Sequence, residues 1–143
     1  MSGFLGRHEF QIDATGRVSL PSAFRRVVSG SPLVLLQWQS THLDIFPRET
    51  WAEIRRNLLT DRKARKDKGA YLRRFTSSAV EIEPDAHGRI RIPGWLLEQA
   101  GIQDTVLFIG ALDRIELWHP ERFEKHLREQ EEDDDGFAAQ IFG

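Results

Sequence analysis

Short runs of apolar and polar residues alternate along this chain, and turn-forming residues separate them. In one such run, Val18 and Leu20 point to one side of an extended backbone while Arg17 and Ser19 point to the other. Runs of this length and period are typical of β-strands. The pattern predicts strands at residues 4–12, 17–20, 33–36, 43–46, 80–83, 89–92, 105–109 and 114–118.

Apolar residues at helical spacing predict helices between and after these strands. Trp51, Ile54 and Leu58 share one face of a helix that begins near Pro47. The sequence between residues 61 and 69 is highly charged and predicts a loop or a frayed helix, and the acidic run after Gln130 predicts disorder. The last apolar residues, 137–142, would then dock on a partner or be mobile. Further helices are predicted at 22–28, 70–76 and 93–100, and from residue 120 onward.

Two segments that lie 72 residues apart have nearly the same sequence. Residues 13–21 are DATGRVSLP and residues 85–93 are DAHGRIRIP. Each predicts a turn that leads directly into an arginine, then a short strand, then a proline that ends it. The same offset, without insertion, aligns 34–36 with 106–108, 43–46 with 115–118 and Trp51 with Phe123. The chain is therefore predicted to be a tandem duplication of one β-turn-β-α-β-β unit.

The length and composition limit the class of protein. A chain of 143 residues can form one compact domain, whereas either unit alone would be marginal, so we expect a core shared within the chain or with neighbouring subunits. The absence of cysteine excludes disulfides, zinc–thiolate sites and thiol catalysis. Without a long apolar run or an apolar N-terminal stretch, we expect no membrane span, no signal peptide and a cytoplasmic location.

The net charge of −2 hides an uneven distribution. Residues 129–135 contain six acidic side chains, and without them 16 acidic residues face 20 basic ones. Between residues 48 and 74 there are ten Lys or Arg and four Asp or Glu. A basic patch of this kind attracts a polyanion. A solvated helix face followed by a solubilising acidic tail explains the same distribution, so charge alone leaves both interpretations open.

The arginine after each turn is the candidate functional group. Turn stability accounts for the aspartate and the glycine but does not require Arg17 or Arg89. An arginine fork can bond a phosphate or both acceptors on the major-groove edge of guanine, and a two-stranded ribbon fits the major groove. Asp13 and Asp85 can hold these arginines in place, although ordinary surface pairing of the same residues is the alternative. Phosphate contacts are predicted from Arg7, Arg25, Arg26 and Arg91.

The twice-repeated motif Asp-x-x-Gly-Arg-[Val/Ile]-x-[Leu/Ile]-Pro resembles the AbrB/SpoVT-type swapped-hairpin unit. Two such units in one polypeptide resemble the MraZ family of bacterial transcriptional regulators, over nearly all of residues 4–128. Supporting signs are Phe-Leu-Gly at 4–6, Leu-x-Ile-Phe-Pro at 43–47 and Ile-Glu-Leu-Trp at 115–118. His87 stands where the first turn has Thr15, so the two units are expected to contact DNA unequally.

The resemblance implies a regulator that binds double-stranded DNA at repeated promoter boxes. Its targets would be the division and cell-wall gene cluster, including its own promoter, and it would be a nucleoid-associated, ring-like homo-oligomer. The family's Asp-x-x-x-Arg motif maps onto Asp13 with Arg17 and onto Asp85 with Arg89. The DNA-binding residues predicted in this way, together with neighbouring candidates, are Asp13, Gly16, Arg17, Asp85, Gly88 and Arg89, with Arg7 and Arg91.

The expected fold class is α+β, mainly β. It consists of two tandem β-β-α-β-β units that form a pseudo-twofold swapped-hairpin double-psi-type barrel with flanking helices. The expected boundaries are 4–50 for the first unit, 51–76 for a helical linker, 77–123 for the second unit, and 124–143 for the end of a helix and the acidic tail.

Three other functional classes compete with DNA binding. An enzyme is disfavoured because the chain lacks phosphate-loop, serine-hydrolase and zinc-protease motifs, and its five histidines have no metal-ligand spacing. No catalytic residue, metal ligand or cofactor is therefore predicted. An AbrB/MazE-like antitoxin would usually carry one unit and a longer tail. A non-DNA oligomeric scaffold would use the face formed by Trp51, Ile54 and Leu58.

Overall fold

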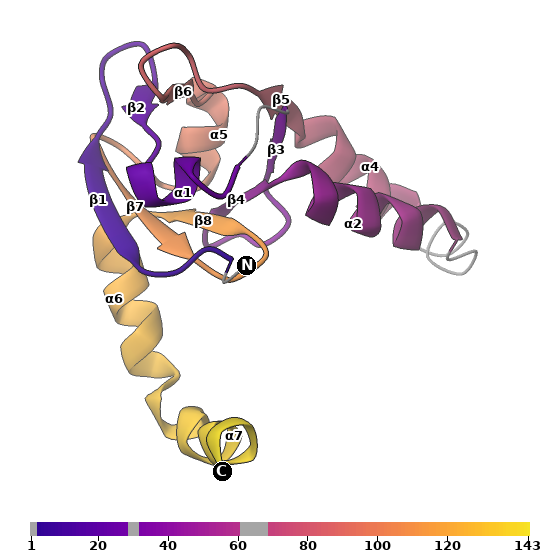
Figure 1. Cartoon of the computed structure of the whole chain (residues 1–143), viewed down its shortest axis with the longest axis vertical. Coiled ribbons are helices and arrows are strands. Elements are labelled where there is room, and N and C mark those ends of the chain that lie inside the picture. Colours follow the sequence, from indigo (N-terminus) through magenta and orange to yellow (C-terminus); the bar gives the residue numbers. More distant parts are fainter. Residues whose placement is uncertain (1–2, 29–31, 61–68) are drawn as a thin grey trace.

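The computed structural model describes residues 3–28, 32–60 and 69–143 (Figure 1). The first repeat contains strands β1 (Arg7–Gln11), β2 (Arg17–Ser19), β3 (Leu33–Leu36) and β4 (Leu43–Phe46), with helix α1 (Ser22–Arg25) between β2 and β3. The second repeat contains β5 (Val80–Ile82), β6 (Arg89–Arg91), β7 (Thr105–Gly110) and β8 (Ile115–Trp118), with helix α5 (Gly94–Gln99) between β6 and β7. The predicted order of elements is therefore present in both repeats.

The two repeats exchange their first strands. One antiparallel sheet has the order β1-β7-β8-β4-β3-β5, and β2 pairs with β6 in a separate two-stranded ribbon. Strand β1 of the first repeat thus lies beside β7 of the second, and β5 of the second lies beside β3 of the first. The expected α+β class built from two tandem AbrB-like units is confirmed, and the strand pairing shows how the units interlock.

The 72-residue offset becomes an approximate twofold symmetry of the fold. Strands β4 and β8 are equivalent in the two repeats, and they pair with each other at the centre of the sheet. Asp44 of β4 lies opposite Glu116 of β8 in this pairing, and these two residues are also 72 positions apart. Strands β2 and β6 are equivalent in the same way and also pair with each other. Each pair of equivalent central strands therefore meets across the pseudo-twofold axis.

Both repeats contribute to one core. Val18 and Leu20 are almost fully buried, and so are their equivalents Ile90 and Ile92. All four belong to the same apolar cluster. Complete burial of a side chain of this size contributes about 1.5–3 kcal/mol relative to leaving it exposed. Since the cluster draws on both repeats, the expectation of a core shared within the chain is confirmed.

Prolines begin the two short helices at equivalent positions. Pro21 precedes α1 with φ −51°, and Pro93 precedes α5 with φ −55°. A ring-locked φ of this value suits the start of a helix, and a missing N–H costs nothing there. The helices α1 and α5 cover the part of the core nearest the β2–β6 ribbon (Figure 1).

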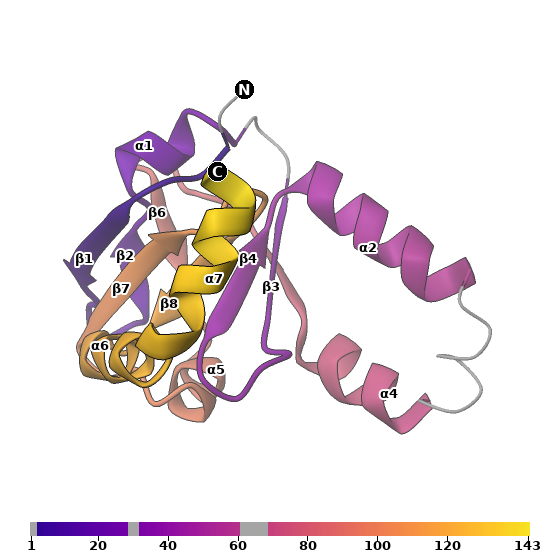
Figure 2. The ribbon, with the colours of Figure 1, turned by 90° about the horizontal axis from the view of Figure 1, so that it is seen from below.

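The remaining helices extend from the body of the molecule. Helices α2 (Arg48–Thr60) and α4 (Gly69–Ser78) project together beyond the β3–β5 edge of the sheet (Figures 1 and 2). The predicted face of α2 is confirmed, because Trp51, Ile54 and Leu58 pack against buried residues of β3 and β4. Helix α6 (Pro120–Glu129) follows β8 and leads to α7 (Glu131–Phe142). In the part of the chain described, no helix has both the length and the apolar composition needed to cross a membrane.

Two sequence-based expectations differ from the structure. The chain after Gln130 was expected to be disordered but forms α7, in which Ala138, Ala139 and Gln140 have high helix propensity. The predicted helix at 22–28 ends at Arg25, and the N–H of Val27 donates to the carbonyl of Phe24 in a tighter turn. The predicted loop or frayed helix at 61–69 falls on residues outside the described ranges, except that Gly69 begins α4.

Candidate nucleic-acid interface

The first arginine turn is built around the carboxylate of Asp13. Its Oδ1 accepts hydrogen bonds from the backbone N–H of Thr15 (2.8 Å), the Thr15 hydroxyl (2.7 Å) and the N–H of Arg17 (2.9 Å). These bonds, the one from Thr15 Oγ above all, lower the pKa of Asp13 below its ordinary value of 3.8. The carboxylate therefore stays charged at neutral pH and fixes the backbone from which Arg17 leaves the turn.

The second turn repeats this arrangement with one difference. Oδ1 of Asp85 accepts from the N–H groups of His87 (2.8 Å) and Arg89 (3.0 Å). Its Oδ2 accepts in addition from Nε of Arg89 at 3.1 Å, and the bond to the Arg89 N–H is the main cause that lowers the pKa of Asp85. In the first turn the Thr15 hydroxyl takes the extra bond, and Asp13 does not hold the Arg17 side chain. The two turns therefore differ in how they hold the arginine side chain, and unequal contact with DNA stays a prediction.

Glycine is required at the third position after each aspartate. Gly16 has φ +86° and Gly88 has φ +76°, a region that residues with a side chain rarely adopt. A Cβ on Gly16 would lie 2.5 Å from the carbonyl oxygen of Ile92, and a Cβ on Gly88 would collide with the Arg25 guanidinium. The predicted glycines thus shape the turns, and Arg25 lies directly against the second of them.

The β2–β6 ribbon joins the two turns. The N–H of Ile92 donates to the carbonyl of Gly16 (2.8 Å), and the N–H of Leu20 donates to the carbonyl of Gly88 (2.9 Å). Each turn is therefore tied to the strand of the other repeat. The strands are three residues long, so the turns lie about 10 Å apart along the ribbon. Both protrude at the same end of the molecule (Figure 1).

The ribbon concentrates positive charge on this end. Arg17 lies directly opposite Arg91, and Arg89 lies opposite Ser19. Like charges in directly opposed positions destabilise a strand pair. Nε of Arg91 donates to the carbonyl of Thr15 at 3.2 Å, which holds this side chain over the first turn. An unfavourable charge pair on an exposed ribbon is expected where an anionic partner binds.

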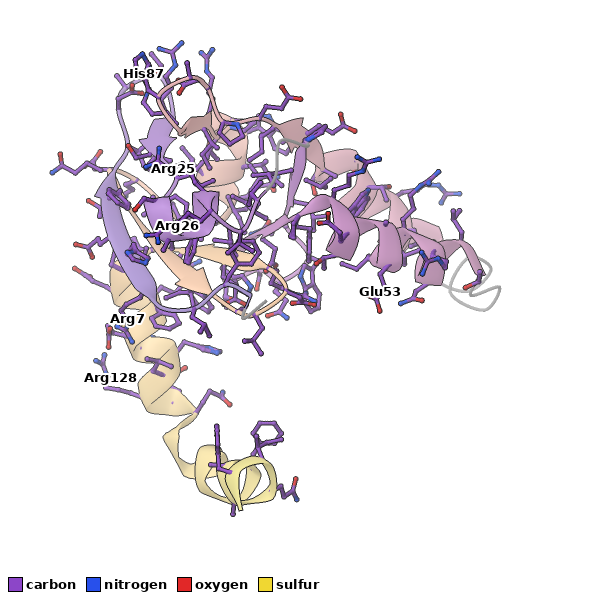
Figure 3. All side chains as sticks on the ribbon, in the orientation of Figure 1. Arg7, Arg25, Arg26, Glu53, His87 and Arg128 are labelled. Carbon is purple, nitrogen blue, oxygen red and sulfur yellow. The ribbon has the colours of Figure 1, made fainter. Side chains whose placement is uncertain are left out.

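Other predicted basic residues are distributed unequally around this surface. The exposed Arg25 and Arg26 lie on and just after α1, below the second turn (Figure 3). Arg7 lies apart from the turns, near α6: its Nη1 bonds Glu124 at 2.5 Å, and its guanidinium stacks on Phe123. The structure therefore brings seven of the eight predicted site residues together and leaves Arg7 elsewhere. The placement of Arg25 could not be found from the repeat, because Leu97 occupies the equivalent position.

Comparisons with known proteins show which family this chain is similar to. The sequence profile of the family described as "MraZ protein, putative antitoxin-like" matches residues 4–74 and again residues 75–141. A transcriptional regulator MraZ from Thermoanaerobacter sp. (strain X514) is 39% identical over 122 residues, which cover 85% of each chain. Proteins of the same name from Saccharopolyspora erythraea and Moorella thermoacetica are similar to this chain at 35% and 33% identity. Those matches cover 91% and 96% of the present sequence, and 90% and 96% of the relatives.

Proposed function

The chain belongs to the MraZ family, and from this membership and the geometry of its arginine turns we propose that it is a transcriptional regulator that binds specific DNA. The proposed targets are the division and cell-wall gene cluster and the promoter of the protein's own gene. The proposed site consists of Asp13, Gly16, Arg17, Asp85, Gly88, Arg89 and Arg91. Nothing in this proposal requires a catalytic step.

The observation that carries the proposal is the pairing of two Asp-x-x-Gly-Arg turns across one exposed ribbon. Each carboxylate accepts a hydrogen bond from the backbone N–H of its arginine. The point at which the arginine side chain leaves the backbone is therefore fixed before DNA binds. Preorganisation of this kind lowers the ordering cost of binding. We assign base contacts to Arg17 and Arg89, because an arginine fork can bond O6 and N7 of a guanine. Arg91 and Arg25, beside the turns, suit phosphate contacts.

A ring-like homo-oligomer on repeated promoter boxes is the second part of the proposal. One ribbon offers few contacts, so a single protomer would bind weakly. Joining several ribbons in one assembly raises the effective concentration of each later contact when the spacing of the boxes matches the spacing of the protomers. We therefore expect affinity to rise steeply from one box to two and three boxes. Equal affinity for the three DNAs would contradict the proposed assembly without affecting the proposed contact residues.

The test is fluorescence anisotropy with DNA from upstream of the protein's own gene and with scrambled DNA of equal length. The experiment is run at several salt concentrations, since phosphate contacts make all DNA affinities salt-dependent. A regulator of the proposed kind binds the upstream DNA more tightly than the scrambled DNA at every salt concentration. Equal binding to both DNAs would overturn the proposal of sequence-specific recognition.

An antitoxin is the competing function, because the family description contains the term antitoxin-like. Toxin neutralisation usually employs a segment outside the DNA-binding unit, and in the described part of the chain the helices α6 and α7 follow the last strand of the second repeat. Co-expression with any small ribonuclease-like protein encoded next to the gene distinguishes the two functions. In this experiment an antitoxin restores the growth of cells that express the ribonuclease-like protein. If growth is still restored after residues 131–143 and both turn arginines are removed, neutralisation is performed by the remaining part of the protein.

A further inference from the structure

A buried cluster of polar groups lies where β4 pairs with β8. His42 and Asp44 are 2% and 0% exposed, and Glu116 reaches them from the neighbouring strand. Among the described residues, Nε2 of His42 and both carboxylate oxygens of Asp44 are buried polar atoms without a hydrogen-bond partner. The groups nearest to these atoms are the other members of the cluster, which form ion-pair contacts of 3.4 and 3.3 Å with Nε2 of His42. Buried polar groups without a well-formed hydrogen bond cost on the order of 1–3 kcal/mol each. An ion bound by all three side chains would satisfy the atoms that the contacts within the cluster leave without such a bond.

The distances between these atoms fit the ligands of a metal ion. Nε2 of His42 is 3.4 Å from Oδ2 of Asp44 and 3.3 Å from Oε2 of Glu116. The three side chains each offer a ligand atom, and these atoms lie within 4.8 Å of one another. Zinc binds imidazole nitrogen and carboxylate oxygen at about 2.0–2.2 Å, so two ligands of a tetrahedral ion are about 3.3–3.5 Å apart. Both separations from His42 have this value, and the ligand oxygens of Asp44 and Glu116 lie within 4.8 Å of each other.

Neighbouring groups orient the three side chains toward one another. Oγ1 of Thr41 lies 2.7 Å from Nδ1 of His42, which leaves Nε2 to face the carboxylates. The ring of Trp118 stacks on the His42 ring at 4.5 Å, and its Nε1 donates to Oε1 of Glu116 at 2.9 Å. Oε2 of Glu116 remains turned toward His42. Outer groups that fix imidazole and carboxylate ligands in this way are a regular feature of metal sites.

Charged residues of the loop before β8 also lie near the cluster. Arg114 of the loop before β8 is equivalent to His42 in the repeat, and it stacks on Phe46 as His42 stacks on Trp118. Its guanidinium is bonded to Asp113 by two contacts, at 2.9 and 3.2 Å, and also attracts Asp44 and Glu116. The carboxylates of Asp44 and Glu116 both face Nε2 of His42, so the cluster places two acidic groups and one ring nitrogen around a single point.

We propose that His42, Asp44 and Glu116 form a binding site for one divalent transition-metal ion, with Zn²⁺ the best match to the nitrogen and oxygen ligands. A site with three protein ligands leaves the fourth position to water. Glu116 is the least buried of the three, so exchange with solvent occurs on its side. Because Asp44 belongs to β4 and Glu116 to β8, the ion joins the two repeats across the pseudo-twofold axis.

The test uses full-length protein purified from metal-depleted medium and titrated with Co²⁺, followed by competition with Zn²⁺. The expected result is one Co²⁺ per chain with the visible absorption of a four- or five-coordinate ion, displaced by Zn²⁺. Glu116→Gln keeps the shape of the side chain and should weaken binding at least about tenfold. His126→Gln is the matched control, since His126 also contacts Trp118 but lies outside the cluster. It should bind as the unaltered protein does.

A second variant keeps the proposal testable if Glu116→Gln fails to fold, which circular dichroism will show. Arg114→Gln removes a positive charge that attracts both carboxylates, and it should tighten Co²⁺ binding several-fold. Absence of saturable binding would overturn the proposal, and the cluster would then be an ion triad held by a proton. Binding that survives Glu116→Gln, or that is weakened by His126→Gln, would mean an adventitious ion only and would overturn it equally.

Discussion

Arg17 lies directly opposite Arg91 where β2 pairs with β6, so one rung of a solvent-exposed ribbon carries two guanidinium groups. Within the described part of the chain, the Arg17 side chain forms no hydrogen bond or ion pair, although its backbone N–H is held by Asp13. Nothing in the fold thus requires an arginine at this position. The repulsion between the Arg17 and Arg91 guanidinium groups is expected to decrease when an anion binds.

The first prediction separates stability from binding at Arg17. Because the side chain has no structural partner, Arg17→Ala should change the free energy of unfolding by no more than about 0.5 kcal/mol, as is usual for surface substitutions. Urea denaturation measures this value. The same variant should bind the upstream DNA about tenfold or more weakly, which corresponds to the loss of one bidentate base contact. A large loss of stability with unchanged binding would show that Arg17 is a structural residue.

The second prediction concerns the type of contact. Arg17→Lys keeps the positive charge but loses the planar fork. We expect it to retain nearly the same dependence of binding on salt concentration while discriminating less between upstream and scrambled DNA. Arg91→Gln should do the opposite, lowering the salt slope by about one with little change in discrimination. Anisotropy titrations at four or more salt concentrations measure both quantities. Identical behaviour of the two variants would contradict the division into base and phosphate contacts.

The third prediction compares the turn glycines. Placing a side chain at positive φ costs about 1–2 kcal/mol in either turn. At Gly16 the new Cβ also meets the backbone oxygen of Ile92, which cannot move without disturbing the ribbon, whereas at Gly88 it meets the flexible Arg25 side chain. Gly16→Ala should therefore lower the free energy of unfolding more than Gly88→Ala does. Chemical denaturation of the two variants side by side checks the order, and the reverse order would contradict the close contact at Ile92.

The fourth prediction uses the different causes of the two lowered aspartate pKa values. A carboxylate whose pKa is lowered in the folded protein stabilises its turn at pH values above 3.8, and this contribution is lost as the pH falls through the lowered pKa. The Thr15 hydroxyl is the largest cause at Asp13, so Thr15→Val should raise the pKa of Asp13 toward 3.8. The pKa of Asp85, which has His87 at the equivalent place, should not change. Carbon-detected NMR of the carboxylates against pH measures both values, and an unmoved Asp13 would contradict the assignment.

Much of the fold could be predicted from the sequence, because the 72-residue repeat and the short strands use local signals. The strands at 33–36 and 43–46 have the predicted bounds, and both turns form at the predicted residues. The exchange of strands between repeats depends on pairing between distant segments, which no local pattern encodes, and it was expected from the family resemblance alone. The unit boundaries at residues 50 and 76 stay a prediction.

The polar cluster at His42 was missed for a related reason. Glu116 lies more than 70 residues from His42 and Asp44 in the sequence, and the three side chains meet only because β4 pairs with β8 across the pseudo-twofold axis. The repeat did contain a signal, since it aligns Asp44 with Glu116 and His42 with Arg114. Two acids at equivalent positions of paired central strands must face each other. That inference requires the strand order, which the sequence pattern did not supply.

We propose that the arginine turns, and not basic charge in general, bind specific DNA. The most direct test compares Arg17→Ala/Arg89→Ala with Arg55→Ala/Arg56→Ala, a pair of exposed arginines on α2 whose removal changes the net charge equally. Both variants are titrated by anisotropy with the upstream DNA and with scrambled DNA at one salt concentration. We expect the turn variant to lose its preference for the upstream DNA and the α2 variant to keep it. Equal weakening by both variants, with the preference intact, would show that the turns contribute only charge and do not read the DNA sequence.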